Sequence, residues 1–137
     1  MVVSATFENI IYVIGVWLEG FESDLESLSS IVDVLDTTSG EWSSVSSIPF
    51  DVNDGGAVVI NKKIYVIGKH SNKKNITYIY DIHSDVWLSS NSYNAPICQF
   101  SDIGVATVND KIYLIGGNDI NDNSQGLVQE GILSSDL

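Results

Sequence analysis

The chain has 137 residues, of which 44% are hydrophobic and two are proline, a size and composition typical of one globular unit. All six basic residues are lysines, against eighteen acidic residues and a formal net charge of −12, which argues against nucleic acid as a partner. No apolar run approaches membrane-spanning length, and residues 1–5 lack the basic region of a secretory signal. We therefore expect a cytoplasmic protein that does not bind membranes.

An apolar segment recurs three times along the chain. Ile10–Gly15 returns as Lys63–Gly68 and again as Lys111–Gly116, at intervals of 53 and 48 residues. Repeats of this period indicate stacked supersecondary units. Each copy follows a second apolar run across a short polar turn, which predicts an antiparallel pair of strands. These preceding runs are Val3–Phe7, Ala57–Ile60 and Gly104–Val108.

The first two units continue with two more predicted strands. Ile31–Asp36 and Ile76–Asp81 alternate in polarity or are rich in β-branched residues, as a third strand requires. A tryptophan follows the final aspartate of each segment by six residues, at Trp42 and Trp87, and the residues between have turn chemistry. We therefore predict that a fourth strand begins near each tryptophan and ends before the next proline.

Four strands per unit, with a central strand apolar on both faces, predict an all-β fold in which neighbouring sheets cover one another. The order strand, turn, aliphatic-Tyr-aliphatic-aliphatic-Gly, strand ending in Asp, and Trp six residues later resembles the kelch repeat. The resemblance implies an incomplete kelch-type β-propeller of four-stranded antiparallel blades over residues 1–137. We expect one blade at about 3–49, a second at about 55–96 and half of a third at about 103–135.

The number of predicted blades has a consequence for assembly. Fewer than three blades cannot close a ring, because closed propellers have about four to eight. An open arrangement exposes the apolar faces and strand edges of its two end blades. We expect these to be covered by the remaining blades of a longer propeller, which we favour, or by a second copy of the chain.

Aromatic residues also recur in register with the repeat. We predict that they fill the same gap between blades each time and that their polar atoms reach backbone partners at the rim. These residues are Tyr12, Tyr65, Tyr113, Trp42 and Trp87.

The resemblance implies a non-catalytic protein-protein interaction module that recognises a partner or substrate, in some relatives as part of a ubiquitin-ligase adaptor. Long loops on a rigid scaffold are favourable places for recognition. We expect binding through the loops 16–30, 50–55, 69–75, 97–103 and 117–126. The candidate partner-binding residues are Glu19, Phe21, Glu22, Asp24, Asp51, Asp54, Lys69, His70, Lys73, Lys74, Asp102, Asp119 and Asp122.

Two alternatives remain open. One is a fragment of a sugar-active or metal-dependent kelch-propeller enzyme, similar to galactose oxidase or to the sialic-acid epimerases. The other is a truncated, nonfunctional remnant. No local motif supplies a nucleophile with its base, and no arginine is present to bind a sugar carboxylate, so we expect neither catalysis nor a cofactor.

Residues 119–130 are the nearest approach to a metal site. Their oxygen-bearing side chains follow the spacing of a calcium loop, although Ser124 replaces the glycine of its sharp turn. We expect a solvated loop here and no bound metal. The calcium-loop candidates are Asp119, Asn121, Asn123 and Glu130.

Overall fold

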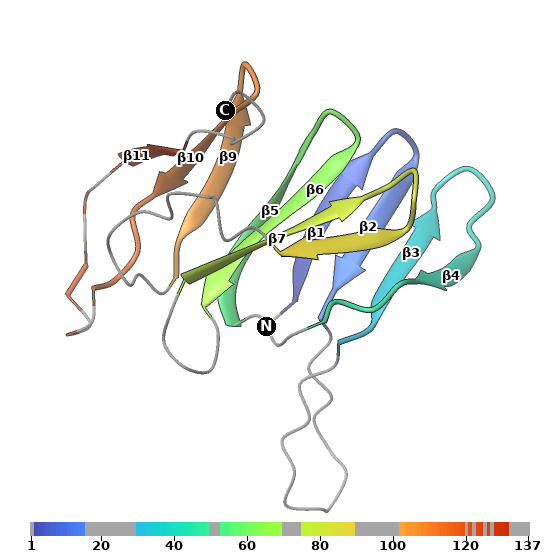
Figure 1. The fold of residues 1–137 in the computed structure, drawn as a ribbon, viewed down its shortest axis with the longest axis horizontal. Coiled ribbons are helices and arrows are strands. Elements are labelled where there is room, and N and C mark those ends of the chain that lie inside the picture. Colours follow the sequence, from blue (N-terminus) through green and yellow to red (C-terminus); the bar gives the residue numbers. More distant parts are fainter. Residues whose placement is uncertain are drawn as a thin grey trace, which may run out of the picture.

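The computed structural model describes residues 2–15, 30–49, 53–69, 75–89, 102–119, 121, 123, 124, 126 and 128–131. These residues form eleven strands in three antiparallel sheets and contain no helix (Figure 1). Two of the sheets have four strands each. The prediction of an all-β fold built from four-stranded antiparallel sheets is confirmed.

In the first sheet each strand pairs with the next along the chain. The turn between its third and fourth strands is stabilised by Asp36, whose carboxylate accepts the N–H groups of Thr38 and Ser39 at 2.7 and 3.3 Å. Gly40 then adopts a φ of 75°, which favours glycine. The strands are β1 (Val3–Phe7), β2 (Ile10–Ile14), β3 (Val32–Asp36) and β4 (Trp42–Val45).

The second sheet repeats this plan. Asp81 caps the corresponding turn by accepting the N–H groups of His83 and Ser84 at 3.0 and 3.1 Å. Asp85, with a φ of 55°, occupies the position that Gly40 has in the first sheet. The strands are β5 (Asn53–Ile60), β6 (Lys63–Lys69), β7 (Asn75–Asp81) and β8 (Val86–Ser89).

The third sheet has three described strands, in the order β11-β10-β9. Sequence analysis predicts the first two, β9 (Gly104–Val108) and β10 (Lys111–Ile115), because they repeat the apolar hairpin of the earlier units. It misses β11 (Val128–Gly131), whose sequence has neither alternation nor β-branched residues beyond Val128. β11 is therefore specified by its pairing with β10 rather than by local propensity.

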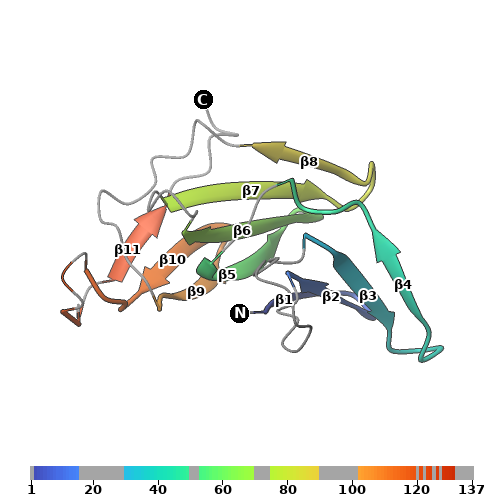
Figure 2. The ribbon, with the colours of Figure 1, turned by 90° about the horizontal axis from the view of Figure 1, so that it is seen from below.

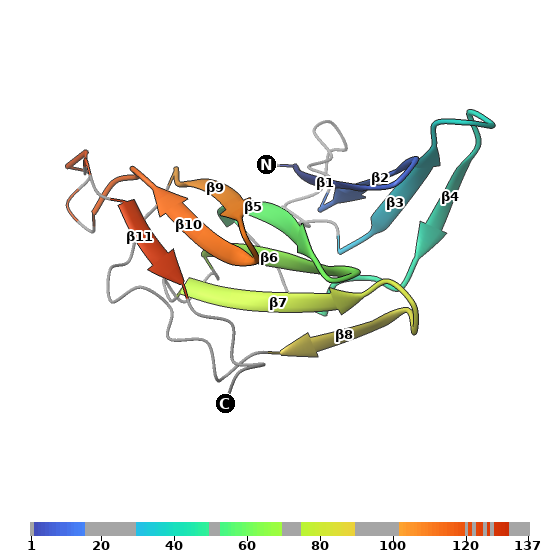
Figure 3. The ribbon, with the colours of Figure 1, turned by 90° about the horizontal axis from the view of Figure 1, so that it is seen from above.

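The three sheets lie next to one another in chain order. β1 contacts β5, and β5 contacts β9, so the first strands of the sheets form an inner series. The later strands spread outward from this series (Figures 2 and 3). This arrangement fits the blades of a kelch-type propeller.

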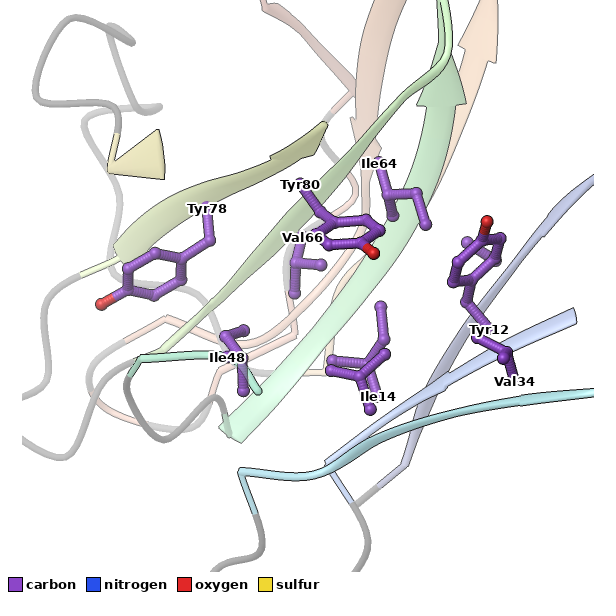
Figure 4. Close-up of a cluster of buried hydrophobic side chains, with 10 residues drawn as sticks. Tyr12, Ile14, Val34, Ile48, Ile64, Val66, Tyr78 and Tyr80 are labelled. Carbon is purple, nitrogen blue, oxygen red and sulfur yellow. The ribbon is translucent and has the colours of Figure 1, made fainter. Parts of the chain in front are cut away.

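Most of the buried side chains in the described ranges form two clusters, one in each gap between neighbouring sheets. The first lies between the first and second sheets (Figure 4) and the second lies between the second and third. The core is therefore shared between sheets, and each sheet depends on its neighbour for burial. The first cluster contains Ala5, Tyr12, Ile14, Val32, Val34, Ile48, Ile64, Val66, Tyr78 and Tyr80. The second contains Val58, Ile60, Tyr65, Ile67, Ile112 and Leu114.

Candidate partner-binding face

The topology separates long connections from tight turns. Because the strands alternate in direction, the final residues of β2, β4, β6, β8 and β10 lie at one end of the sheets, and the tight turns lie at the other (Figure 1). The strand ends that flank all five loops proposed for recognition therefore lie at one end of the molecule. These strand ends share one end of the molecule because of the sheet order, and no motif within the loops indicates it.

Most of the proposed binding residues lie outside the described part of the chain and stay predictions. The backbone of Asp54 and of Lys69 belongs to β5 and β6, at the end of the sheet where the long connections emerge. The residues outside the described ranges are Glu19, Phe21, Glu22, Asp24, Asp51, His70, Lys73, Lys74 and Asp122.

Two described candidates, Asp102 and Asp119, belong to connections that one hydrogen bond joins. Asn118, which directly precedes Asp119, donates from Nδ2 to the Oδ2 atom of Asp102 at 3.3 Å. Asp102 itself has a φ of 55°, a left-handed conformation that aspartate tolerates better than most residues. The contact joins the connection before β9 to the one after β10. Sequence analysis misses Asn118, whose only signal is an amide directly after Gly116–Gly117.

The four calcium-loop candidates make other contacts. Asp119 Oδ1 accepts the N–H groups of Asn121 and Asn123 at 2.8 and 3.0 Å, so this carboxylate stabilises a turn. Glu130 lies on β11 and accepts Lys111 Nζ at 2.7 Å and the Tyr113 hydroxyl at 3.1 Å. In the described ranges, no group of three His, Cys, Asp or Glu side chains is arranged to hold a metal ion.

A group of polar contacts joins the first sheet to the second. Asp85 Oδ1 accepts the Tyr80 hydroxyl at 2.7 Å and the backbone N–H of Ser46, just beyond β4, at 2.9 Å. Trp87 Nε1 donates to the carbonyl oxygen of Ser46 at 2.7 Å. The main chain leaving the first sheet is thus bound through both its N–H and its C=O group. Sequence analysis misses Ser46 and Asp85. The Asp-to-Trp spacing indicates a turn, but it does not indicate which residues of the first sheet the turn contacts.

The recurring aromatic residues do not all share one environment. Tyr12 and Tyr65 are buried between sheets as predicted, and Tyr80 packs between Tyr12 and Trp87 with ring centroids 6.0 and 5.0 Å away. The prediction is wrong for Trp42, which is 61% exposed. Trp42 lies on the face of the first sheet that points away from the second, and no described sheet covers that face.

The junction between the first and second sheets holds Asp85 in its charged form. The hydroxyl of Tyr80 and then the N–H of Ser46 lower the pKa of Asp85 below the ordinary aspartate value of 3.8. Burial, followed by the bond to Asp85, raises the pKa of Tyr80 above its ordinary value. The neutral phenol and the charged carboxylate therefore stabilise each other.

Replacing Asp85 by asparagine should lower the melting temperature at pH 7, because the amide is a weaker acceptor for Tyr80 and Ser46. Asparagine tolerates positive φ, so the turn itself should not change. The lowered folded-state pKa means that the carboxylate contribution is complete above about pH 4 and is lost as pH falls through the folded value. The melting temperatures of parent and variant should therefore converge in acid. Parallel melting curves from pH 7 to pH 2 test this, and a constant difference across that range would contradict it.

Comparison with known proteins gives a family match and two related sequences. Residues 53–91 match the family model described as Kelch motif. The chain is 37% identical over 54 residues to Kelch-like protein 22 of Homo sapiens, and to the same degree to Kelch-like protein 22 of Ailuropoda melanoleuca. The match covers 36% of this chain but only 8% of each relative.

The described part of the chain holds no helix with the length and apolar character needed to cross a membrane.

Proposed function

Because this chain is, over part of its length, a member of the kelch-repeat family, we propose that it is a protein-interaction module. One observation supports this proposal above the others. The strand ends that flank all five long connections lie at one end of three mutually packed sheets (Figure 1). Such a scaffold presents variable loops side by side to a partner while the sheets stay rigid.

We propose further that the module is non-catalytic, needs no cofactor and acts in the cytoplasm. We propose that it consists of two blades, at about 3–49 and 55–96, and half of a third at about 103–135. In a ubiquitin-ligase adaptor, the role that the family resemblance implies, such a module would hold the substrate. The contacts of Asp119 and Glu130 support a role in turn and strand structure for these carboxylates.

The charges of the long connections indicate which partners the module would bind. Residues 1–61 contain ten acidic residues and no basic one, whereas five of the six lysines lie between residues 62 and 74. Acidic and basic loops at one end would contact complementary charges on a partner. We therefore expect binding to weaken as salt is added, because exposed charge pairs are screened.

Matched charge reversals at the two ends of the sheets test whether a partner binds at the end with the long connections. Glu22→Lys with Asp24→Lys alters a long connection, and Glu8→Lys with Asp110→Lys alters two exposed tight turns at the opposite end. The tagged chain should capture partners from a lysate of its own cells. Affinity for a purified partner should fall at least about tenfold with the first pair and stay unchanged with the second. Equal losses with both pairs, or no loss with the first, would refute this choice of binding end.

A further inference from the structure

Ser46 is an exposed residue at the point where the chain leaves the first sheet, directly after β4 (Trp42–Val45). Its two hydrogen bonds to the second sheet use backbone atoms. The N–H group donates to Asp85 Oδ1 at 2.9 Å, and the carbonyl oxygen accepts Trp87 Nε1 at 2.7 Å. Any residue except proline could form both bonds, so neither of them requires the hydroxyl group of Ser46.

The hydroxyl group of Ser46 lies beside a carboxylate. The Tyr80 hydroxyl, then the N–H of Ser46 and, to a smaller extent, the hydroxyl of Ser46 lower the pKa of Asp85, because all three stabilise its charged form. In the described ranges, neither lysine nor histidine forms an ion pair with Asp85. The other charged groups that act on Tyr80 and on the adjacent Tyr12 are acidic as well, Asp81 and Glu8. A negative charge added to Ser46 would therefore meet like charges.

The residues on either side of Ser46 restrict its movement. Val45, the last residue of β4, packs against the cluster between the first and second sheets. Ile48 belongs to this cluster and is 3% exposed, and its N–H group donates to the carbonyl oxygen of Ser30 at 2.9 Å. The Oγ atom of Ser46 therefore cannot move far from Asp85 unless the backbone bond between the two residues breaks.

The pairing of Ser46 with Asp85 is particular to this junction. Gly40 occupies the position of Asp85 in the turn of the first sheet and has no side chain with which to bond a neighbouring segment. Ser46 follows Trp42 by four residues, whereas the residue four after Trp87 is an asparagine. The repeat itself therefore requires neither the serine nor the aspartate.

We propose that Ser46 is a phosphorylation switch between the first two sheets, in which a phosphoryl group on Oγ releases residues 46–48 from the second sheet. A protein kinase would transfer the γ-phosphoryl group of ATP to this oxygen. The Oγ–P bond forms as the bond to the departing ADP breaks, and the hydroxyl proton passes to the kinase. Phosphoserine carries about −1.5 to −2 charges at pH 7, so it repels Asp85 and competes with it for the N–H group of Ser46. The switch acts on the junction itself and does not depend on the partner of the module.

The full chain with phosphoserine incorporated at position 46, or at position 47 as the matched control, tests the proposal. Ser47 is also exposed and would gain the same charge, but no described contact joins it to Asp85. Phosphoserine at position 46 should lower the melting temperature at pH 7 by at least about 5 °C, and at position 47 by less than about 2 °C. Hydrogen exchange of the Trp87 indole N–H, followed by NMR, should accelerate only with phosphoserine at position 46. Equal shifts at the two positions, or no shift at position 46, would contradict the proposal.

Removing the carboxylate distinguishes charge repulsion from a steric effect of the phosphoryl group. In the Asp85→Asn variant, phosphoserine at position 46 should lower the melting temperature by less than half as much, because the phosphoryl group then faces a neutral amide. If the phosphorylated chain does not fold, Ser46→Asp is compared with Ser46→Asn, which has a similar size and no charge. Ser46→Asp should melt at a lower temperature, and the difference should shrink as salt is added. A phosphoserine effect that Asp85→Asn leaves unchanged, or equal melting of Ser46→Asp and Ser46→Asn, overturns the proposal.

Discussion

Replacing Gly55 by alanine should lower the free energy of unfolding by about 3 kcal/mol, the upper part of the usual range for overpacking. A Cβ atom at this position would overlap the carbonyl oxygen of Ile67 and the Cα atom of Gly68 on the paired strand. Both are backbone atoms and cannot rotate away, so the irregular pairing at the start of β5 would have to shift. Urea denaturation followed by tryptophan fluorescence measures the loss.

Gly126→Ala is the matched control for Gly55→Ala. A Cβ atom at Gly126 meets no other atom within 4 Å, so the free energy of unfolding should change by less than about 0.5 kcal/mol. Similar losses for both variants would contradict the assignment of the loss to the close approach of β5 to β6, because alanine in open space lowers the entropy of the unfolded chain and should not destabilise the fold.

Replacing Ile64 by alanine should lower the free energy of unfolding by about 3 kcal/mol, because the truncation leaves a cavity in the core. Ile64 is completely buried in the cluster between the first and second sheets. A loss of this size is a large share of the total stability of a small domain. Denaturation at protein concentrations too low for association isolates the effect on the single chain.

Ile11 provides the comparison for Ile64, because it holds the same position in the first sheet but lies on the face that points away from the second sheet. Ile11→Ala should cost less than half as much in the dilute chain, since its side chain is only partly buried there. Equal costs for the two variants would contradict this difference in burial between the two faces of the first sheet.

Local sequence was sufficient to predict ten of the eleven strands that the described residues form, for identifiable physical reasons. β1 occupies Val3–Phe7, as predicted, because an apolar run ends at a polar turn where Glu8 adopts positive φ. β11 was missed because pairing with β10, and not its own composition, makes it a strand. The contact between Asp102 and Asn118 was missed because it joins two loops that approach each other only through the third sheet.

Residues close together in the chain specify the repeat, the alternation of the strands and the aspartate-capped turns, so these features can be recognised in the amino-acid sequence. Which of two equivalent residues is covered by a neighbouring sheet depends instead on packing between segments far apart in the chain. Trp42 and Trp87 follow their aspartates at the same spacing, yet Trp87 bonds to Ser46 on the neighbouring sheet and Trp42 is exposed. The reason is that burial in this fold is supplied by the adjacent sheet, and a local pattern contains no information on whether that sheet is there.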